Sequence, residues 1–316
     1  EARMSPQLNR MFYGFFPHSW AQHIRGGSFR PLVFLPHGLI LAIFVATAFL
    51  SSLVLWRSDQ EARSRSGWII AAVILFGVLV LCHSLGALAL GLMFCPLILL
   101  LGCRLQMIFA AVFAALVLIY PIMRGGGLVP VDQIHAFAVS INQDRAASLK
   151  TRLDNEDRLL ERAQEKPVAG WGTWGRNRVF DESGKDLSVT DGYWVIVIGS
   201  FGWLGYLAQF GLLTLPTILL GLRQRQFDLS LATSGLALIL CVLLLDLIPN
   251  ASIGPLTWLI AGSMMGRYQT ATRRSEHAAD AEAHSQDAGT LAAETASGPK
   301  VLYRRSFETH RNAQRE

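Results

Sequence analysis

Residues 148–165 carry an arginine and a glutamate whose types and spacing suit recognition of a phosphate or pyrophosphate. The apolar residues of this segment recur at helical spacing, and the helix should end before Pro167. At about 100° per residue, Glu156 lies about 20° and Arg152 about 60° from Leu149, so both fall on or beside the packing face. An ion pair between Arg152 and Glu156 is one interpretation, and it contributes only about 0.2–0.5 kcal/mol. The other is that Arg152 faces a ligand, because its guanidinium fork matches phosphate oxygens.

Two further candidates, Asp191 and Tyr193, border the apolar run 192–222. A carboxylate at this place suits the N-cap of a helix. It is also a candidate base that removes the proton of an acceptor hydroxyl. Spacing alone favours the cap.

A glycine-rich turn lies between these two groups, and it contains Trp171 and Trp174. Its glycines at 170, 172 and 175 indicate a tight backbone path. The tryptophans suit either stacking on a sugar ring or a place in the interfacial belt of a membrane.

The distribution of charge identifies the elements that must position these residues. Apolar residues make up 52% of the 316 and charged residues 16%, against about 25% in soluble proteins. All but five of the charges lie in four stretches: 1–31, 57–65, 123–191 and 267–316. Long apolar segments between compact charged clusters are typical of a multi-pass membrane protein.

The predicted fold is all-α: a polytopic transmembrane helix bundle with about seven spans and a long helical loop, 123–191. The run 68–103 has no formal charge and would measure about 54 Å as one helix, so it must reverse near His83. Glycines at 199, 202 and 205 are expected to break or tilt the long run 192–222. The predicted spans are 32–56, 67–82, 84–103, 105–122, 192–222, 229–248 and 252–266.

The arginines of the short loops predict which side each loop occupies. Every second short loop is basic, which places those loops in the cytoplasm by the positive-inside rule. Residues 1–31 and the loop 123–191 then lie on the outer side, which in a bacterial inner membrane is the periplasm. The tail 267–316 is expected to be cytoplasmic and disordered because it is polar and lacks apolar periodicity. The chain begins with Glu1 and shows no cleavable signal pattern, so we expect further helices upstream.

Three more residues are candidates on the outer side. Arg25 and Arg30 precede the first span, where topology does not call for cations; Arg30 either snorkels to headgroups or binds substrate. His37, at the start of the span, has a structural and a catalytic interpretation.

Asp246 lies inside an apolar run, near its outer end. An ionisable residue in a span is a functional hypothesis by default. A carboxylate that reaches water at the interface is an equal alternative. The sharper hypothesis makes Asp246 the partner of an outer arginine.

Several classes of function are excluded or not indicated. The four cysteines lie in apolar segments without metal-ligand spacing, so neither a disulfide framework nor a metal site is expected. No basic run with interleaved aromatics is present, which argues against nucleic acid. We expect no cofactor.

Taken in order, the pieces resemble the O-antigen ligase and polymerase family of bacterial membrane proteins, over roughly residues 25–265. The resemblance rests on order, spacing and placement on one membrane face rather than on a single motif. The matching elements are Arg30-Pro31 before a span with Pro36 at its start, Ser84-Leu85-Gly86-Ala87, Ser148-x3-Arg152 running into Pro167-x2-Gly170-x-Gly172, and Asp191-x-Tyr193 followed by Gly202-x-x-Gly205.

The resemblance implies an inverting, metal-independent glycosyltransferase that uses an undecaprenyl-pyrophosphate-linked glycan donor and a glycan or lipid acceptor. Arg152 and Arg30 would hold the pyrophosphate, with Arg25, Tyr193, Trp171 and Asp246 as further substrate-binding candidates. Asp191, or in its place Glu156, would act as base. Ligases of this family usually carry a histidine where Asp191 stands, which favours polymerisation of exopolysaccharide or O-antigen over ligation.

Two other classes stay open. A transporter of lipid-linked glycans would show charged or broken spans at mid-membrane. A scaffold that binds polysaccharide-assembly proteins would have no site at all. The polar residues gather on the outer face, which favours the enzyme.

Overall fold

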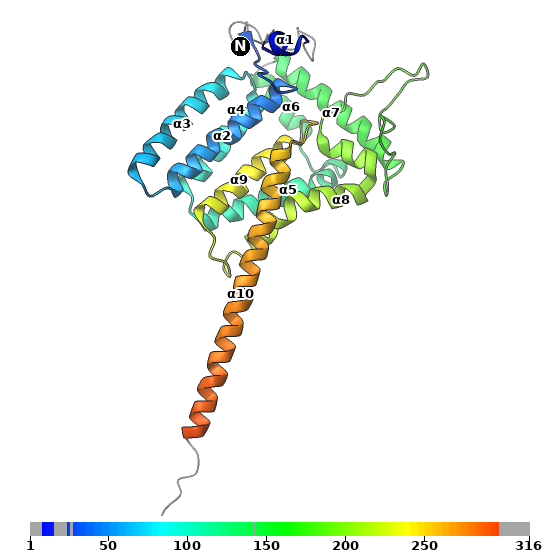
Figure 1. Ribbon diagram of the computed structural model, residues 1–316. Coiled ribbons are helices and arrows are strands. Elements are labelled where there is room, and N and C mark those ends of the chain that lie inside the picture. Colours follow the sequence, from blue (N-terminus) through cyan, green and yellow to red (C-terminus); the bar gives the residue numbers. More distant parts are fainter. Residues whose placement is uncertain (1–7, 16–23, 26–27, 142, 297–316) are drawn as a thin grey trace, which may run out of the picture. The chain divides into compact units, whose positions relative to one another are not determined.

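The computed structural model describes residues 8–15, 24–25, 28–141 and 143–296, and about three quarters of them are helical (Figure 1). The chain divides into two units, residues 1–271 and 272–316. The elements in chain order are α1 (Leu8–Tyr13), β1 (Ile24–Arg25), β2 (Ser28–Phe29), α2 (Gly38–Ser58), α3 (Ala62–Leu81), α4 (Leu85–Leu100), α5 (Cys103–Gly125), α6 (Val131–Ile141), α7 (Gln143–Gln164), α8 (Tyr193–Leu222), α9 (Leu231–Asp246) and α10 (Pro255–Ala296). The two short strands pair antiparallel.

Four helices of the described chain are long and apolar enough to cross a membrane: Gly38–Ser58, Arg63–Leu81, Cys103–Gly125 and Tyr193–Leu222. The predicted spans 84–103 and 229–248 correspond to α4 and α9, which are apolar but shorter, with 16 residues each. The predicted span 252–266 corresponds to the first part of α10. These apolar helices fit a multi-pass membrane protein.

The reversal expected near His83 is present between α3 and α4. Helix α3 ends at Leu81 and α4 begins at Leu85. His83 adopts a left-handed backbone conformation with φ 51°, which turns the chain within three residues.

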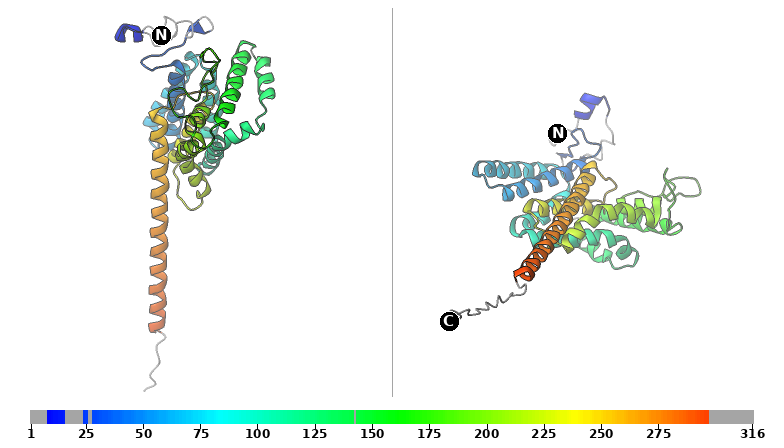
Figure 2. Two further views of the ribbon diagram at one scale, coloured as in Figure 1. Left: turned by 90° about the vertical axis from the view of Figure 1, so that its right-hand side faces the viewer. Right: turned by 60° about the horizontal axis from the view of Figure 1, so that its bottom comes forward.

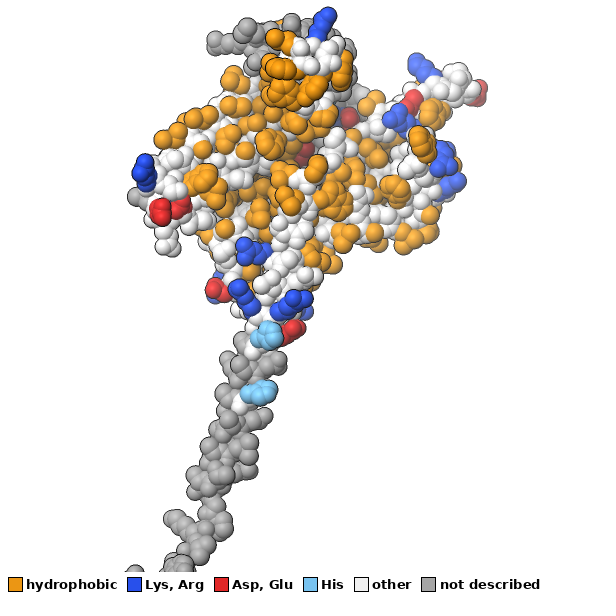
Figure 3. Space-filling model, viewed as in Figure 1, with side chains coloured by type: hydrophobic (Ala, Val, Ile, Leu, Met, Phe, Trp, Pro, Cys, Tyr) orange, Lys and Arg blue, Asp and Glu red, His pale blue; other side chains and the backbone are white. Residues whose placement is uncertain are grey.

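The core of the bundle lies around α9, which contacts α2, α4 and α5. Its side chains from Ala237 to Leu244 are all buried. By contrast, α3 packs mainly against α2 and leaves Ile70, Val73 and Ile74 exposed. Hydrophobic side chains cover much of the surface in Figure 3, whereas Lys and Arg gather at its margins. This pattern fits a lipid-facing surface.

Helix α8 is broken at Gly202, as its glycines predict. Gly202 has φ 64° and ψ −169°, a conformation outside the helical region. The break leaves backbone groups without partners inside α8, and the glycine-rich turn supplies them. The bonds are Trp171 N–H to Gly199 O (2.8 Å), Gly172 N–H to Ser200 O (2.8 Å), Trp203 N–H to Pro167 O (2.7 Å) and Leu204 N–H to Val168 O (3.3 Å). Satisfied backbone groups make such a break tolerable in an apolar setting.

Two of the glycines are required for this docking. A Cβ atom on Gly202 would collide with the carbonyl of Val168, and one on Gly170 would lie 2.5 Å from the backbone of Ser200. Both glycines also have positive φ. The glycine-rich turn therefore supplies the backbone hydrogen-bond partners that the broken helix lacks.

The loop 123–191 carries α6 and α7, which pack side by side (Figure 2). The helix predicted from residue 148 begins earlier, at Gln143, and ends at Gln164, before Pro167. Among its apolar residues Leu160 and Ala163 are buried, and α7 contacts α8.

The expected disordered tail needs a correction over residues 267–296, which are helical as the continuation of α10. Alanine and glutamate are frequent there and are strong helix formers, so a helix that has already begun propagates through them. The remainder of the tail, 297–316, lies outside the described residues.

Candidate functional site

Two sequence candidates from different parts of the chain form an ion pair. Arg152 Nε of α7 lies 3.4 Å from Asp191 Oδ2 at the end of the loop. The Arg152 guanidinium also donates to Pro249 O in the α9–α10 turn (3.3 Å). Both side chains are about one-third exposed, so a ligand can reach them. The pair of Arg152 with Glu156, one of the two interpretations from sequence, does not form: Arg152 pairs with Asp191 and Glu156 with Arg124.

Asp191 is not the N-cap of α8, contrary to what spacing favoured. Gly192 is the N-cap, with φ 84°, and no side chain caps it. The first free N–H group of the helix, that of Tyr193, donates instead to Leu247 O and Asn250 O, each at 2.9 Å. Carbonyls of the α9–α10 turn thus accept the bond that a side-chain cap would otherwise accept. The Asp191 carboxylate does not cap the helix and pairs with Arg152 instead.

A cavity of about 380 Å³ opens beside Asp191. Its walls are mainly apolar and come from α2, α9 and the segment 250–257. Its polar groups are His37, Asp191, Asp246, Asn250, Ser252 and Thr257. This combination of an apolar wall with a few convergent polar groups is typical of a ligand site.

Asp246, at the end of α9, lines the same cavity. Its Oδ1 accepts a hydrogen bond from Asn250 Nδ2 at 2.8 Å. Asp191, the partner of Arg152, lines this cavity as well. The structure therefore brings together three sequence candidates, Arg152, Asp191 and Asp246.

Glu156 belongs to a separate ion cluster with Arg124 and Asp157, in which Glu156 and Arg124 are buried and Asp157 is half exposed. The exposed fraction of Glu156 is 4%, as its place on the packing face of α7 predicted. Arg124, from the last turn of α5, lies with Nε 3.8 Å from Glu156 Oε2 and with Nη2 2.6 Å from Asp157 Oδ1. Burial raises the pKa of the Glu156 carboxyl to about 7, against the effect of Arg124. Glu156 does not line the cavity.

Sequence reasoning missed Arg124. By sequence Arg124 lies at the boundary of the loop 123–191, where a cation ordinarily reaches water. The structure buries it, with 9% of its surface exposed, and Leu153 O accepts a further hydrogen bond from its Nη2 (3.4 Å). The available signal is its place one turn beyond Tyr120, directly after residues 105–123, which carry no charge.

The side chains of Tyr193 and Trp171 form hydrogen bonds with residues other than Arg152. The Tyr193 hydroxyl accepts a hydrogen bond from Gln209, beyond the break, which holds the two halves of α8 together. Trp171 donates its indole N–H to Arg162 O (2.8 Å), and its ring lies under the Arg162 guanidinium, 3.4 Å from the centroid. Arg162 is ten residues beyond Arg152, about 15 Å along α7.

The residues before the first span have structural contacts. Arg30 Nη2 donates to His83 O (3.3 Å), and its aliphatic part packs over Gly38, so it joins the start of α2 to the α3–α4 turn. His37 caps α2, with Nδ1 accepting from Leu39 N–H (3.0 Å), which supports its structural interpretation. Arg30 does not line the cavity. The side chain of Arg25 lies outside the described residues.

Within the described part of the chain, no three His, Cys, Asp or Glu side chains lie together as metal ligands would. Comparison of the chain with protein-family models, with curated proteins and with solved structures finds no match. The resemblance to the O-antigen ligase and polymerase family stays a prediction.

Proposed function

We propose that this protein is a membrane glycosyltransferase that polymerises or transfers polysaccharide from an undecaprenyl-pyrophosphate carrier at the outer face of the bacterial inner membrane. The observation that carries the proposal is the ion pair of Arg152 with Asp191, of which Asp191 lines an apolar cavity. A lipid-linked sugar has an apolar chain, an anionic pyrophosphate and a polar sugar. The apolar cavity wall suits the lipid chain, Arg152 suits the pyrophosphate, and the carboxylates suit the hydroxyls of the sugar.

The proposed reaction is a direct displacement at the anomeric carbon. The acceptor hydroxyl forms a bond to that carbon and gives its proton to the Asp191 carboxylate. The bond from carbon to the pyrophosphate oxygen breaks with inversion, and Arg152 stabilises the charge that develops on the leaving pyrophosphate. In the ligand-free site the same guanidinium is held by Asp191, so donor binding would free the carboxylate for the acceptor.

Burial favours Asp191 over Glu156 as the base. The Asp191 side chain is 30% exposed and borders the cavity, whereas Glu156 is shielded and paired with Arg124. Asp246 already accepts a hydrogen bond from Asn250. We assign Asp246 to substrate binding and Glu156 to the framework that holds α7 against α5.

A transporter of lipid-linked glycans is the second candidate, because the break in α8 is a feature of many carriers. In carriers, the backbone groups at such a break bind the cargo. Here four of those groups are bonded to residues 167–172. Because these backbone groups already have partners within the chain, they are not free to bind cargo, which favours the transferase over the transporter.

The decisive experiment compares the lipid-linked glycans of cells that lack the protein, of complemented cells and of cells with Arg152→Ala. Single repeat units that accumulate on the outer face indicate a polymerase, and finished chains on the carrier indicate a ligase. Accumulation on the cytoplasmic face indicates a transporter and overturns the proposal. Normal polysaccharide in the Arg152→Ala strain, at a normal protein level, also overturns it.

A further inference from the structure

A cavity of about 410 Å³ lies beside the start of α9, whereas the cavity beside Asp191 lies at the end of that helix. Its walls are the first two residues of α5 and the segment 224–229 between α8 and α9. Helix α9 has 16 residues, so about 24 Å of helix separates the two cavities. The complete lining is Cys103, Arg104, Gln224, Arg225, Gln226, Phe227, Asp228 and Leu229.

Close packing between α5 and α8 brings the two walls of this cavity together. A Cβ atom on Gly221, near the end of α8, would collide with Ala111 Cβ of α5. Beyond α8, the Cys103 thiol donates a hydrogen bond to Leu229 O at 3.0 Å. The segment between α8 and α9 is therefore held against the start of α5.

Two arginines, Arg104 and Arg225, line this cavity, and both are exposed. Neither forms an ion pair with another described residue, although Asp228 lines the same cavity. Their guanidinium groups therefore have donors to offer to a ligand from outside the chain.

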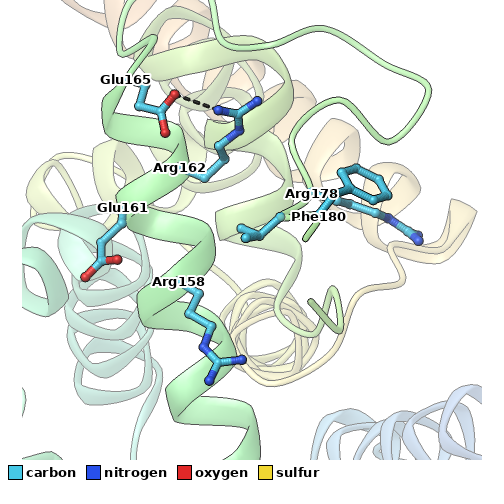
Figure 4. Close-up of a pocket in the computed structure, with 7 residues that line it drawn as sticks. Arg158, Glu161, Arg162, Glu165, Arg178 and Phe180 are labelled. Atoms are coloured by element: carbon cyan, nitrogen blue, oxygen red, sulfur yellow. Dashed lines mark hydrogen bonds and ion pairs between the residues drawn. The ribbon is translucent and has the colours of Figure 1, made fainter. Parts of the chain in front are cut away.

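The groove between α7 and the segment 178–180, drawn in Figure 4, differs in this respect. Arg162 Nη1 there binds Glu165 Oε2 at 2.6 Å, and Arg178 Nη1 binds Asp186 Oδ2 at 2.8 Å. The Arg178 side chain also points away from α7. Two of the three arginines that line the groove therefore have their counter-charge within the chain.

The cavity beside the start of α9 lies at the depth where lipid headgroups are expected. Helix α5 is a candidate span that begins at Cys103, and α8 is a candidate span that ends at Leu222. Residues directly outside the ends of spans lie among headgroups, and basic pockets between membrane helices bind anionic headgroups. Arginine suits a phosphodiester because its guanidinium donates two parallel hydrogen bonds.

An exposed apolar stripe on α5 begins at the residue after Arg104. At about 100° per residue, its members all lie within about 60° of Leu105. They are Leu105, Ile108, Phe109, Val112, Leu116 and Ile119. The stripe runs from the cavity along the span, so it offers a surface to acyl chains that extend from a headgroup at Arg104. A soluble anion would make no use of it.

We propose that this cavity binds the headgroup of an anionic glycerophospholipid, with its phosphate on Arg104 and Arg225 and its acyl chains along the α5 stripe. The lining carries two positive charges and one negative charge, that of Asp228, so a headgroup with one net negative charge complements it. Phosphatidylglycerol has that charge, and its glycerol hydroxyls match the Asp228 carboxylate as an acceptor. The site does not depend on the proposed function.

The test measures lipid binding to the full chain, purified and delipidated in detergent. Native mass spectrometry counts the phosphatidylglycerol molecules that bind during a titration, and the melting temperature reports the stabilisation. Phosphatidylglycerol should bind and raise the melting temperature, and phosphatidylcholine should bind about tenfold more weakly. Arg104→Gln and Arg225→Gln should each weaken binding of phosphatidylglycerol about tenfold, the usual effect of losing a hydrogen bond between charged groups.

Arg63→Gln is the matched control. Arg63 is an exposed arginine in the first turn of α3, and it does not line the cavity. It lies just beyond the end of α2, where Val54 packs against Gly235 near the start of α9, so it belongs to the same end of the bundle. Arg63→Gln should leave binding unchanged. Melting temperatures in lipid-free detergent show whether the variants fold.

Three outcomes would overturn the proposal. Unchanged binding by the double variant Arg104→Gln/Arg225→Gln, or equal weakening by Arg63→Gln, would show that the lipid does not use this cavity. Equal binding of phosphatidylcholine would show that the charge of the headgroup is not recognised. Inorganic phosphate that displaces the lipid and stabilises the protein equally would show a site for a soluble anion. Arg152→Ala should retain lipid binding, so this proposal and the proposed function fail separately.

Discussion

Arg152 of α7 and Asp191 at the entrance of α8 form an ion pair across the junction of the long loop with the helix bundle, with Nε 3.4 Å from Oδ2. Neither residue belongs to a motif that is specific alone. Their contact, beside an apolar cavity, is what makes them a site. The first two predictions test each partner in turn.

Replacement of Arg152 by alanine should reduce polysaccharide synthesis by about 10²- to 10³-fold, the usual cost of losing a group that stabilises developing charge. Arg152→Lys should restore only part of the activity, because an ammonium keeps the charge and loses the planar fork. Lys150→Ala, an exposed position on the same helix, is the matched control. Synthesis is measured from labelled surface polysaccharide per unit of protein.

Replacement of Asp191 by asparagine should slow transfer by about 10²- to 10⁴-fold, the range for loss of a general base. The donor should still bind, since Arg152 is intact, so lipid-linked donor should co-purify with the variant. Mass spectrometry of the bound lipid measures this. Full activity of Asp191→Asn would remove the base assignment and leave the role of Arg152 unaffected.

Gly202→Ala should destabilise the protein strongly, because a Cβ atom meets Val168 O and the backbone has positive φ. Gly170→Ala should do the same from the other side of the contact. Gly211→Ala, on the same helix with open space around it, should be neutral or stabilising by up to about 1 kcal/mol. The melting temperature in detergent is the measurement. Equal values for the three variants would contradict the requirement for glycine where the glycine-rich turn packs against the break in α8.

The buried carboxyl of Glu156 should make stability depend on pH. Because burial raises its folded pKa from 4.5 to about 7, the folded state holds its proton more tightly than the unfolded state. Its contribution is fully present below about pH 4.5, and the free energy of unfolding falls by up to about 3 kcal/mol as pH rises through 7.

Glu156→Gln isolates this effect, since the amide does not titrate. The difference in unfolding free energy between the protein and the variant should change between pH 4.5 and 7 in the direction just given. Asp157, paired with the same arginine, is half exposed, and Asp157→Asn should not remove the dependence. A pH-independent difference between the protein and Glu156→Gln would refute the assignment.

Much of the fold follows from local patterns. Apolar run lengths located the helices, the reversal near His83 followed from the excessive length of residues 68–103, and the break in α8 followed from its glycines. These features depend on short-range properties, namely helix rise, bilayer thickness and backbone freedom at glycine. The helical continuation to Ala296 does not follow from apolar content, which is low there, but from the helix propensity of its alanines and glutamates.

Within the candidate site, the sequence determined which residues are chemically capable and that Glu156 would be buried, because helical periodicity fixes the face on which a residue lies. Partner choice was decided by tertiary structure. Arg152 pairs with Asp191 rather than with Glu156, Glu156 faces Arg124, and carbonyls of the α9–α10 turn take the place of a cap. A contact between residues on different helices depends on how those helices pack, and no spacing along one chain segment encodes that.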